Sequence, residues 1–104
     1  MTESEWRLFR QLQAVSLDRF CQRVLTEVGE LAADAAKTNH ERYLEVFRLL
    51  KRRDKELAAA FDDPRRSVAL QQLACIQSHG LLTAEEFARF RPETRASVQA
   101  VLGD

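Results

Sequence analysis

Cys75 and His79 are the residues whose spacing most directly suggests chemistry. They lie four positions apart in a segment with helical periodicity, so one helix face could present both as metal ligands or as a thiol and its base. The remaining cysteine and histidine are Cys21 and His40, and no closely spaced ligand pairs typical of zinc sites occur. A Cys–His nucleophile also needs a third group to orient the base. We therefore expect no cofactor, no metal and no catalytic residue.

A second candidate is a basic segment between positions 48 and 66. Its seven bases outnumber its four acids, so a local positive excess sits in a chain whose 16 basic and 16 acidic residues balance. This segment could bind phosphate or an acidic partner, or it could be a solvated helix face with internal pairs such as Arg52–Glu56. Aromatic residues do not alternate with the bases, which disfavours base stacking. The anion-patch candidates are Arg48, Lys51, Arg52, Arg53, Arg65 and Arg66.

Asp54 is the third candidate, because it interrupts an apolar stripe. The stripe consists of Tyr43, Phe47, Leu50, Asp54, Leu57 and Phe61, spaced 4-3-4-3-4 as in a helical seam. An unpaired carboxylate inside such a seam costs several kcal/mol. Asp54 is therefore our buried polar candidate. It forms a structural ion pair, lies near the rim of the contact, or fixes the register of the helices.

The elements that position these residues are predicted to be helices. Apolar residues recur at helical spacing, no run alternates as a strand does, and 104 residues suffice for one domain with a core. We predict a single all-α domain over residues 1–104, a bundle of four to five helices with two long antiparallel helices and a C-terminal helical hairpin. The predicted helices are about 3–36, 39–61, 64–79, 84–90 and 92–102.

Local signals mark the ends of these helices. Thr2, Thr38 and Thr83 each precede a Glu by three positions, the pattern of a capping box. Gly80 is expected in the left-handed conformation, with Leu81 and Ile76 in contact, as in a Schellman ending. The first helix could be broken at Ser16, which can act as a cap, but an unbroken apolar stripe favours one long helix.

Residues 70–87 resemble the SHOCT motif, a short helical hairpin often found near the C-termini of bacterial proteins. The resemblance rests on Leu70-Gln71-Gln72-Leu73 followed by Gly80-Leu81-Leu82-Thr83-Ala84-Glu85-Glu86-Phe87. It ends after Phe87, where the lysine and leucine pair of the motif are missing. The resemblance implies association or oligomerisation rather than an active site.

The compartment and the macromolecular partners are predicted from what the chain contains. The N-terminal residues are acidic, and no apolar stretch approaches the roughly 18 residues needed to span a bilayer, so we expect a cytoplasmic protein that does not insert into membranes. Cys21 and Cys75 are expected to be reduced, although a single disulfide between them stays open. Zero net charge, and acids at positions 85 and 86 of a would-be recognition helix, argue against nucleic-acid binding.

The first helix predicts an interface. A helix over residues 3–36 spans about 50 Å, whereas a compact domain of this size is roughly 34 Å across, so one end must overhang. We expect the N-terminal end to overhang, because apolar residues occur there on two faces: Trp6, Leu8, Phe9, Leu12 and Val15. The sequence thus favours a non-catalytic interaction or regulatory module that forms a homodimer or binds an unidentified protein. The alternative is a nucleic-acid or phosphate-binding accessory protein that uses residues 48–66.

Overall fold

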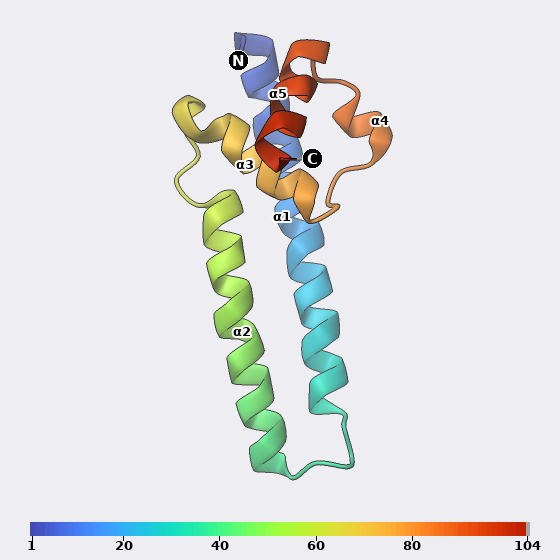
Figure 1. Ribbon diagram of the computed structural model, residues 1–104. Coiled ribbons are helices and arrows are strands. Elements are labelled where there is room, and N and C mark those ends of the chain that lie inside the picture. Colours follow the sequence, from blue (N-terminus) through green and yellow to red (C-terminus); the bar gives the residue numbers. More distant parts are fainter. Residues whose placement is uncertain (104) are drawn as a thin grey trace.

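The computed structural model describes residues 1–103, and within them the chain forms five α-helices and no strand (Figure 1). The predicted all-α bundle is confirmed, with two long antiparallel helices followed by shorter ones. The helices are α1 (Glu3–Ala32), α2 (Asn39–Phe61), α3 (Arg66–Ser78), α4 (Ala84–Phe87) and α5 (Pro92–Leu102).

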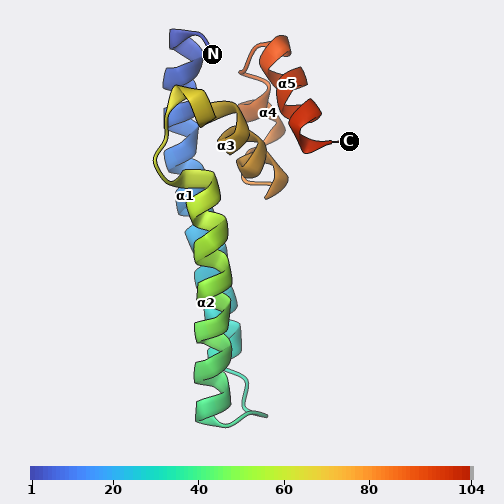
Figure 2. The same ribbon diagram turned by 60° about the vertical axis from the view of Figure 1, so that its left-hand side comes forward.

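The molecule has two parts of different thickness. Helices α3, α4 and α5 gather around the N-terminal half of α1, while the rest of α1 runs on beside α2 with no third helix against it (Figures 1 and 2). We call residues 21–57 the stalk, and residues 1–20 with 58–103 the head. The extents are 52 × 26 × 25 Å and the radius of gyration is 16.4 Å, against about 13 Å for a compact domain of this size.

The expectation that the N-terminal end of α1 overhangs is wrong. Phe9 is fully buried and Leu12 is only 5% exposed, both within the core of the head. The C-terminal end of α1 overhangs instead, paired with α2 in the stalk (Figure 1). The physical reason is that the apolar residues near the N-terminus lie on two sides of α1. Helices α3 and α5 of the same chain can therefore cover them. The fully or nearly buried core residues are Phe9, Leu12, Phe20, Val24, Ala60, Phe61, Ala69, Leu73, Ala74, Ile76, Leu81, Phe90 and Val98.

Helix α1 is one unbroken helix, as the sequence favoured. Ser16 is fully buried in its interior and caps nothing. The helix ends at Ala32 rather than near position 36, because the Asp34 carboxylate accepts the Ala36 N–H at 3.1 Å and turns the chain. Helix α3 begins at Arg66 rather than 64, after Asp63 takes a positive φ of 49°. Helix α4 ends at Phe87 rather than position 90.

The helix ends follow the sequence signals closely. Complete capping boxes occur at Thr38 with Glu41 and at Thr83 with Glu86. Gly80 has φ +64°, the Leu81 N–H donates to the Ile76 carbonyl at 3.3 Å, and the Gly80 N–H donates to the Gln77 carbonyl at 3.0 Å. This is the predicted Schellman ending, and it turns the chain back toward α1.

The first capping box is only half formed, because Glu5 serves another helix. Thr2 Oγ1 accepts the Glu5 N–H, but the Glu5 carboxylate accepts the Arg91 N–H and the Thr94 hydroxyl, each at 3.0 Å. Arg91 is the N-cap of α5 and offers no capping side chain of its own. Glu5 is 6% exposed. Burial raises its pKa, but the hydrogen bonds from Arg91 and Thr94 outweigh this and hold the pKa below 4.5.

Two arginines of α1 fasten the turn between α3 and α4. Arg19 donates to the Leu81 carbonyl at 2.8 Å and to both Glu86 oxygens at 2.7 and 3.0 Å. Arg23 donates to the carbonyls of His79 and Gly80. These carbonyls lie at and just beyond the C-terminal end of α3, where the helix dipole favours cations. The Arg19 hydrogen bonds, followed by the Thr83 backbone, lower the pKa of Glu86 to about 2.

We predict that Glu5→Ala loosens α5. The substitution leaves the partly buried Arg91 N–H and Thr94 hydroxyl without their acceptor, and it should lower the free energy of unfolding by about 1–2 kcal/mol in urea titrations at neutral pH. Because the folded-state pKa of Glu5 is depressed, its contribution is present above pH 4.5 and is lost as the pH falls through that lowered pKa. The difference in free energy of unfolding between wild type and variant should therefore become smaller in acid. Glu30→Ala, an exposed change on the same helix, is the control, and equal losses in the two variants would contradict the capping role.

Candidate protein–protein interface

Helix α2 turns a rather polar stripe toward α1. Leu49 is buried at 2% exposure and Ala60 is fully buried, while Arg42 donates to the Ala32 carbonyl of α1 at 2.7 Å. Arg53 on the same stripe binds Glu27 of α1. The residues at this 4-3-4-3-4 spacing are Arg42, Val46, Leu49, Arg53, Glu56 and Ala60. The contact between the two long helices is therefore displaced by one residue from the seam that the sequence predicted.

The predicted seam is left at the edge of the α1–α2 contact, largely open to solvent. Tyr43 is 66% exposed, Phe47 50% and Leu50 45%, whereas Phe61, at the level of the head, is 7% exposed. On α1, Leu25 is 68% exposed. Within residues 1–103, Leu57 and Phe61 of this more apolar α2 stripe pack on the core of the head, but Tyr43, Phe47 and Leu50 have no covering helix, although such stripes normally face a core.

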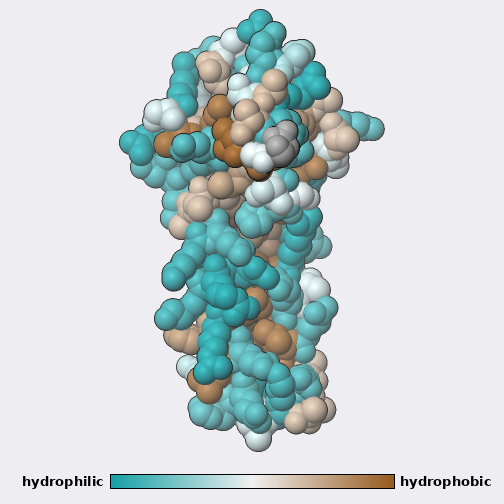
Figure 3. Space-filling view, in the orientation of Figure 1, coloured by the Kyte–Doolittle hydropathy of each residue, from teal (hydrophilic) through white to brown (hydrophobic). Residues whose placement is uncertain are grey.

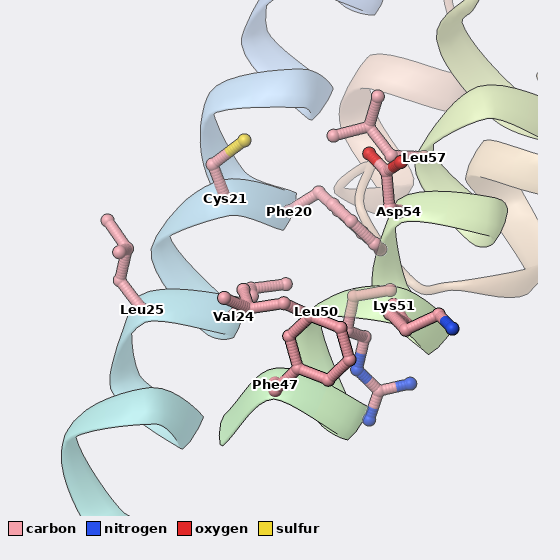
Figure 4. A pocket seen from close by; sticks show the side chains of 10 residues that line it. Phe20, Cys21, Val24, Leu25, Phe47, Leu50, Lys51, Asp54 and Leu57 are labelled. Carbon is pink, nitrogen blue, oxygen red and sulfur yellow. The ribbon is translucent and has the colours of Figure 1, made fainter. Parts of the chain in front are cut away.

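A groove of about 540 Å³ lies between α1 and α2, and Leu25, Phe47 and Leu50 are among the residues that line it. Phe20, Cys21, Val24 and Leu25 supply one wall, and the other comes from Phe47, Leu50, Lys51, Arg53, Asp54 and Leu57. Figure 4 looks into the groove from the side opposite to Figure 1, so that α1 lies on the left and α2 on the right. Helices α3, α4 and α5 lie toward the viewer of Figure 1, and Figure 3 shows that hydrophilic side chains dominate the stalk on that side.

Asp54 stands at the rim of the groove and is not buried, which corrects our buried polar candidate. It forms no ion pair with any residue between 1 and 103. One turn earlier, the Lys51 ammonium lies 5.5 Å from the centre of the Phe47 ring. The rim thus carries two exposed, opposite charges above an apolar floor.

The ion pair between α1 and α2 is made by Arg53, the residue before Asp54. Its guanidinium donates to Glu27 at 2.9 and 3.1 Å and to Glu56 at 3.0 and 3.1 Å. The hydrogen bonds from Arg53 lower the pKa of Glu27 despite its partial burial. Arg53 therefore fixes the register of α2 on α1, the role that we had considered for Asp54. Arg53 and Asp54 are adjacent and lie 100° apart around α2. The spacing of apolar residues along the sequence could not tell which of the two faces α1.

The predicted N-terminal interface residues are mostly used inside the head. Phe9 and Leu12 are core residues, and Trp6 and Leu8 are half-buried against that core. Trp6 stacks on Phe9, with ring centres 5.7 Å apart. Val15 is 39% exposed and is the most open of the five. This end of α1 therefore offers no continuous apolar face.

The predicted anion patch divides in two. Arg53 is paired as described, Arg65 lies 3.3 Å from Asp63, and Arg66 pairs with Glu3. Arg48, Lys51 and Arg52 are exposed, as is Lys55, and none of the four has an ion pair with residues 1–103. The Arg52–Glu56 pair that the sequence suggested is not formed, because Glu56 binds Arg53 instead.

The residues that suggested chemistry are dispersed. His79 packs its ring edge-on against Phe20 with centres 5.7 Å apart, and both cysteines are free and half-buried. No group of three or more potential metal ligands occurs among residues 1–103. Over the same residues, none of the helices combines the length and the apolar character required to cross a bilayer.

Comparisons with known proteins add no relative: no family model, no curated protein and no solved structure matches this chain. The resemblance of residues 70–87 to the SHOCT motif therefore stays a prediction. The structure shows that this segment comprises most of α3, the Gly80 turn and α4, which pack on α1 within the head.

We predict that Arg53 and Asp54 differ sharply in their effect on folding. Arg53→Met removes two ion pairs that join α2 to α1 and to its own next turn, and it should lower the free energy of unfolding by about 1 kcal/mol. Asp54→Leu removes an exposed charge and should stay within about 0.5 kcal/mol of wild type. Chemical denaturation of both variants in dilute solution measures this, with Arg52→Met as the matched control. A larger loss in Asp54→Leu than in Arg53→Met would contradict the observed register.

Proposed function

We propose that this protein is a small, non-catalytic helical interaction module that docks onto a protein partner through the groove face of the stalk. We define the groove face as the exposed apolar residues Leu25, Tyr43, Phe47 and Leu50 with the groove beneath them. The sequence-based predictions of a regulatory, cytoplasmic protein remain part of this proposal.

The observation that supports the proposal is that α2 turns its more polar stripe toward α1 and leaves much of its more apolar stripe exposed. The stripe that packs on α1 contains two arginines and a glutamate, whereas the neighbouring stripe leaves two of its aromatic residues and a leucine, Tyr43, Phe47 and Leu50, largely exposed. Folding alone would bury the apolar stripe. The largest contiguous apolar patch on the surface of a monomer is often a binding site. A partner that covers the groove face would account for this choice of residues.

We predict that a photo-crosslinking phenylalanine analogue at position 47 captures one discrete partner in cells. Position 47 is aromatic already and lies on the groove face, so the analogue should leave the fold intact. The adduct should be a single species by mass spectrometry, either another protein or a second copy of this chain.

The control is the same analogue at position 52, which lies on the same helix but does not line the groove. Capture at position 47 without capture at position 52 supports docking at the groove face. Equal capture at both positions, or no discrete adduct at position 47, would overturn the proposed function.

A second candidate function, anion binding, is supported by one observation. Arg48, Lys51, Arg52 and Lys55 occupy successive turns of α2 and keep their charges unpaired. Such a ridge could attract phosphate groups or an acidic protein surface by long-range electrostatics. The zero net charge of the chain works against it.

For this second candidate, we expect wild-type protein to be retained on heparin at low salt and to elute as salt rises. Arg48→Glu with Arg52→Glu and Lys55→Glu should abolish retention while leaving thermal stability nearly unchanged, because all three side chains are exposed. Reversal of Arg65 alone, which is already paired with Asp63, should have a smaller effect. If the wild type flows through heparin at low salt, anion binding is excluded.

A further inference from the structure

We infer that the occupant of the groove face is a second copy of this chain, arranged antiparallel across a two-fold axis so that Lys51 of each copy faces Asp54 of the other. This inference rests on the proposed function and specifies the partner. It would turn two two-helix stalks into one four-helix bundle with the two heads at opposite ends.

The charges at the rim are the first argument. Lys51 and Asp54 are three residues apart on one exposed helix face, carry opposite charges, and pair neither with each other nor with any residue from 1 to 103. A two-fold interface brings residue i of one copy to residue j of the other, and residue j to residue i. If the axis passes between positions 51 and 54 of two antiparallel α2 helices, each Lys51 meets an Asp54. An excess of one charge at the rim would instead indicate a partner of opposite charge.

Shape is the second argument. The groove opens on the side of the stalk that faces away from α3, α4 and α5 (Figures 1, 2 and 4), so the chain's own head does not cover it. Two antiparallel helices form a flat layer, and stacking two such layers gives the usual four-helix arrangement, in which the core is closed from both sides.

The area available is the third argument. Phe47 and Tyr43 are at least half exposed, and large fractions of Leu25 and Leu50 are exposed as well. Together these four side chains offer on the order of 300–400 Å² of apolar surface. A standard interface buries about 800 Å² per partner, of which slightly more than half is apolar. The groove face with its flanks therefore approaches what one such interface requires.

The two charge pairs are expected to set the orientation rather than supply most of the affinity. Exposed ion pairs contribute little individually, but like charges facing each other disfavour an arrangement. With the two-fold axis between positions 51 and 54, the antiparallel arrangement pairs opposite charges twice. A parallel arrangement in register would instead place Lys51 at the level of Lys51 and Asp54 at the level of Asp54, so that neither charge meets its opposite across the two α2 helices.

The test uses two charge reversals in the full-length chain, with oligomeric state measured by light scattering after size exclusion and by native mass spectrometry. Purified wild type should be a dimer at ~100 µM, well above the dissociation constant of an ordinary weak complex. Lys51→Asp and Asp54→Lys should each dissociate about tenfold more readily, because each reversal places two pairs of like charges in contact. Mixing the two variants should give a heterodimer of near wild-type affinity, because both pairs are then opposite again.

Arg52→Asp is the matched control, since it changes the charge of the same helix by the same amount but lies outside the groove. It should leave the dimer unchanged, and circular dichroism should show that every variant keeps its helix content. A wild type that remains monomeric at ~100 µM overturns the inference. A wild-type dimer whose two reversed variants show no preference for each other overturns the orientation. In either case, a discrete crosslink from position 47 to another protein would leave the proposed function standing.

Discussion

The length of α1 is the constraint on which the rest of the structure depends. Thirty residues without a break form a rod of about 45 Å, but α3, α4 and α5 are too short to cover more than its N-terminal half. The remainder has only α2 beside it, and two helices bury only the stripes that face each other. A stalk with an uncovered apolar side follows directly from this mismatch between helix length and core size.

In the head, α1 holds the short helices through polar contacts between residues far apart in the sequence. Glu5 caps α5 from across 86 residues of sequence, and Arg19 and Arg23 hold the carbonyls at the α3–α4 turn. Each contact satisfies backbone groups at a helix terminus, where four groups lack intrahelical partners. The short helices are thereby attached to the one long element, which acts as the scaffold of the head and continues into the stalk.

In the stalk, polar residues lie in the contact between α1 and α2, and apolar residues lie on the surface, which is the reverse of the usual arrangement. Arg53 joins the two helices through Glu27 and Glu56, while Phe47 and Leu50 face solvent. Ion pairs in a partly exposed setting stabilise little, so this arrangement favours a fixed register over maximum stability. It also keeps the apolar stripe free on the side away from the head, which is why the groove face, and not the N-terminal end of α1, carries the proposed interface.

The sequence by itself determined the local structure: five helices, the boxes at Thr38 and Thr83, and the Schellman ending at Gly80 all depend on residues within a few positions of each other. Tertiary structure alone decided which end of α1 is covered, because that depends on where α3 and α5 pack. It also decided which of two adjacent α2 stripes faces α1, since a rotation by one residue leaves the helical periodicity unchanged. That rotation placed Asp54 at a groove rim and Arg53 in the helix contact, and it left Phe47 half exposed to solvent.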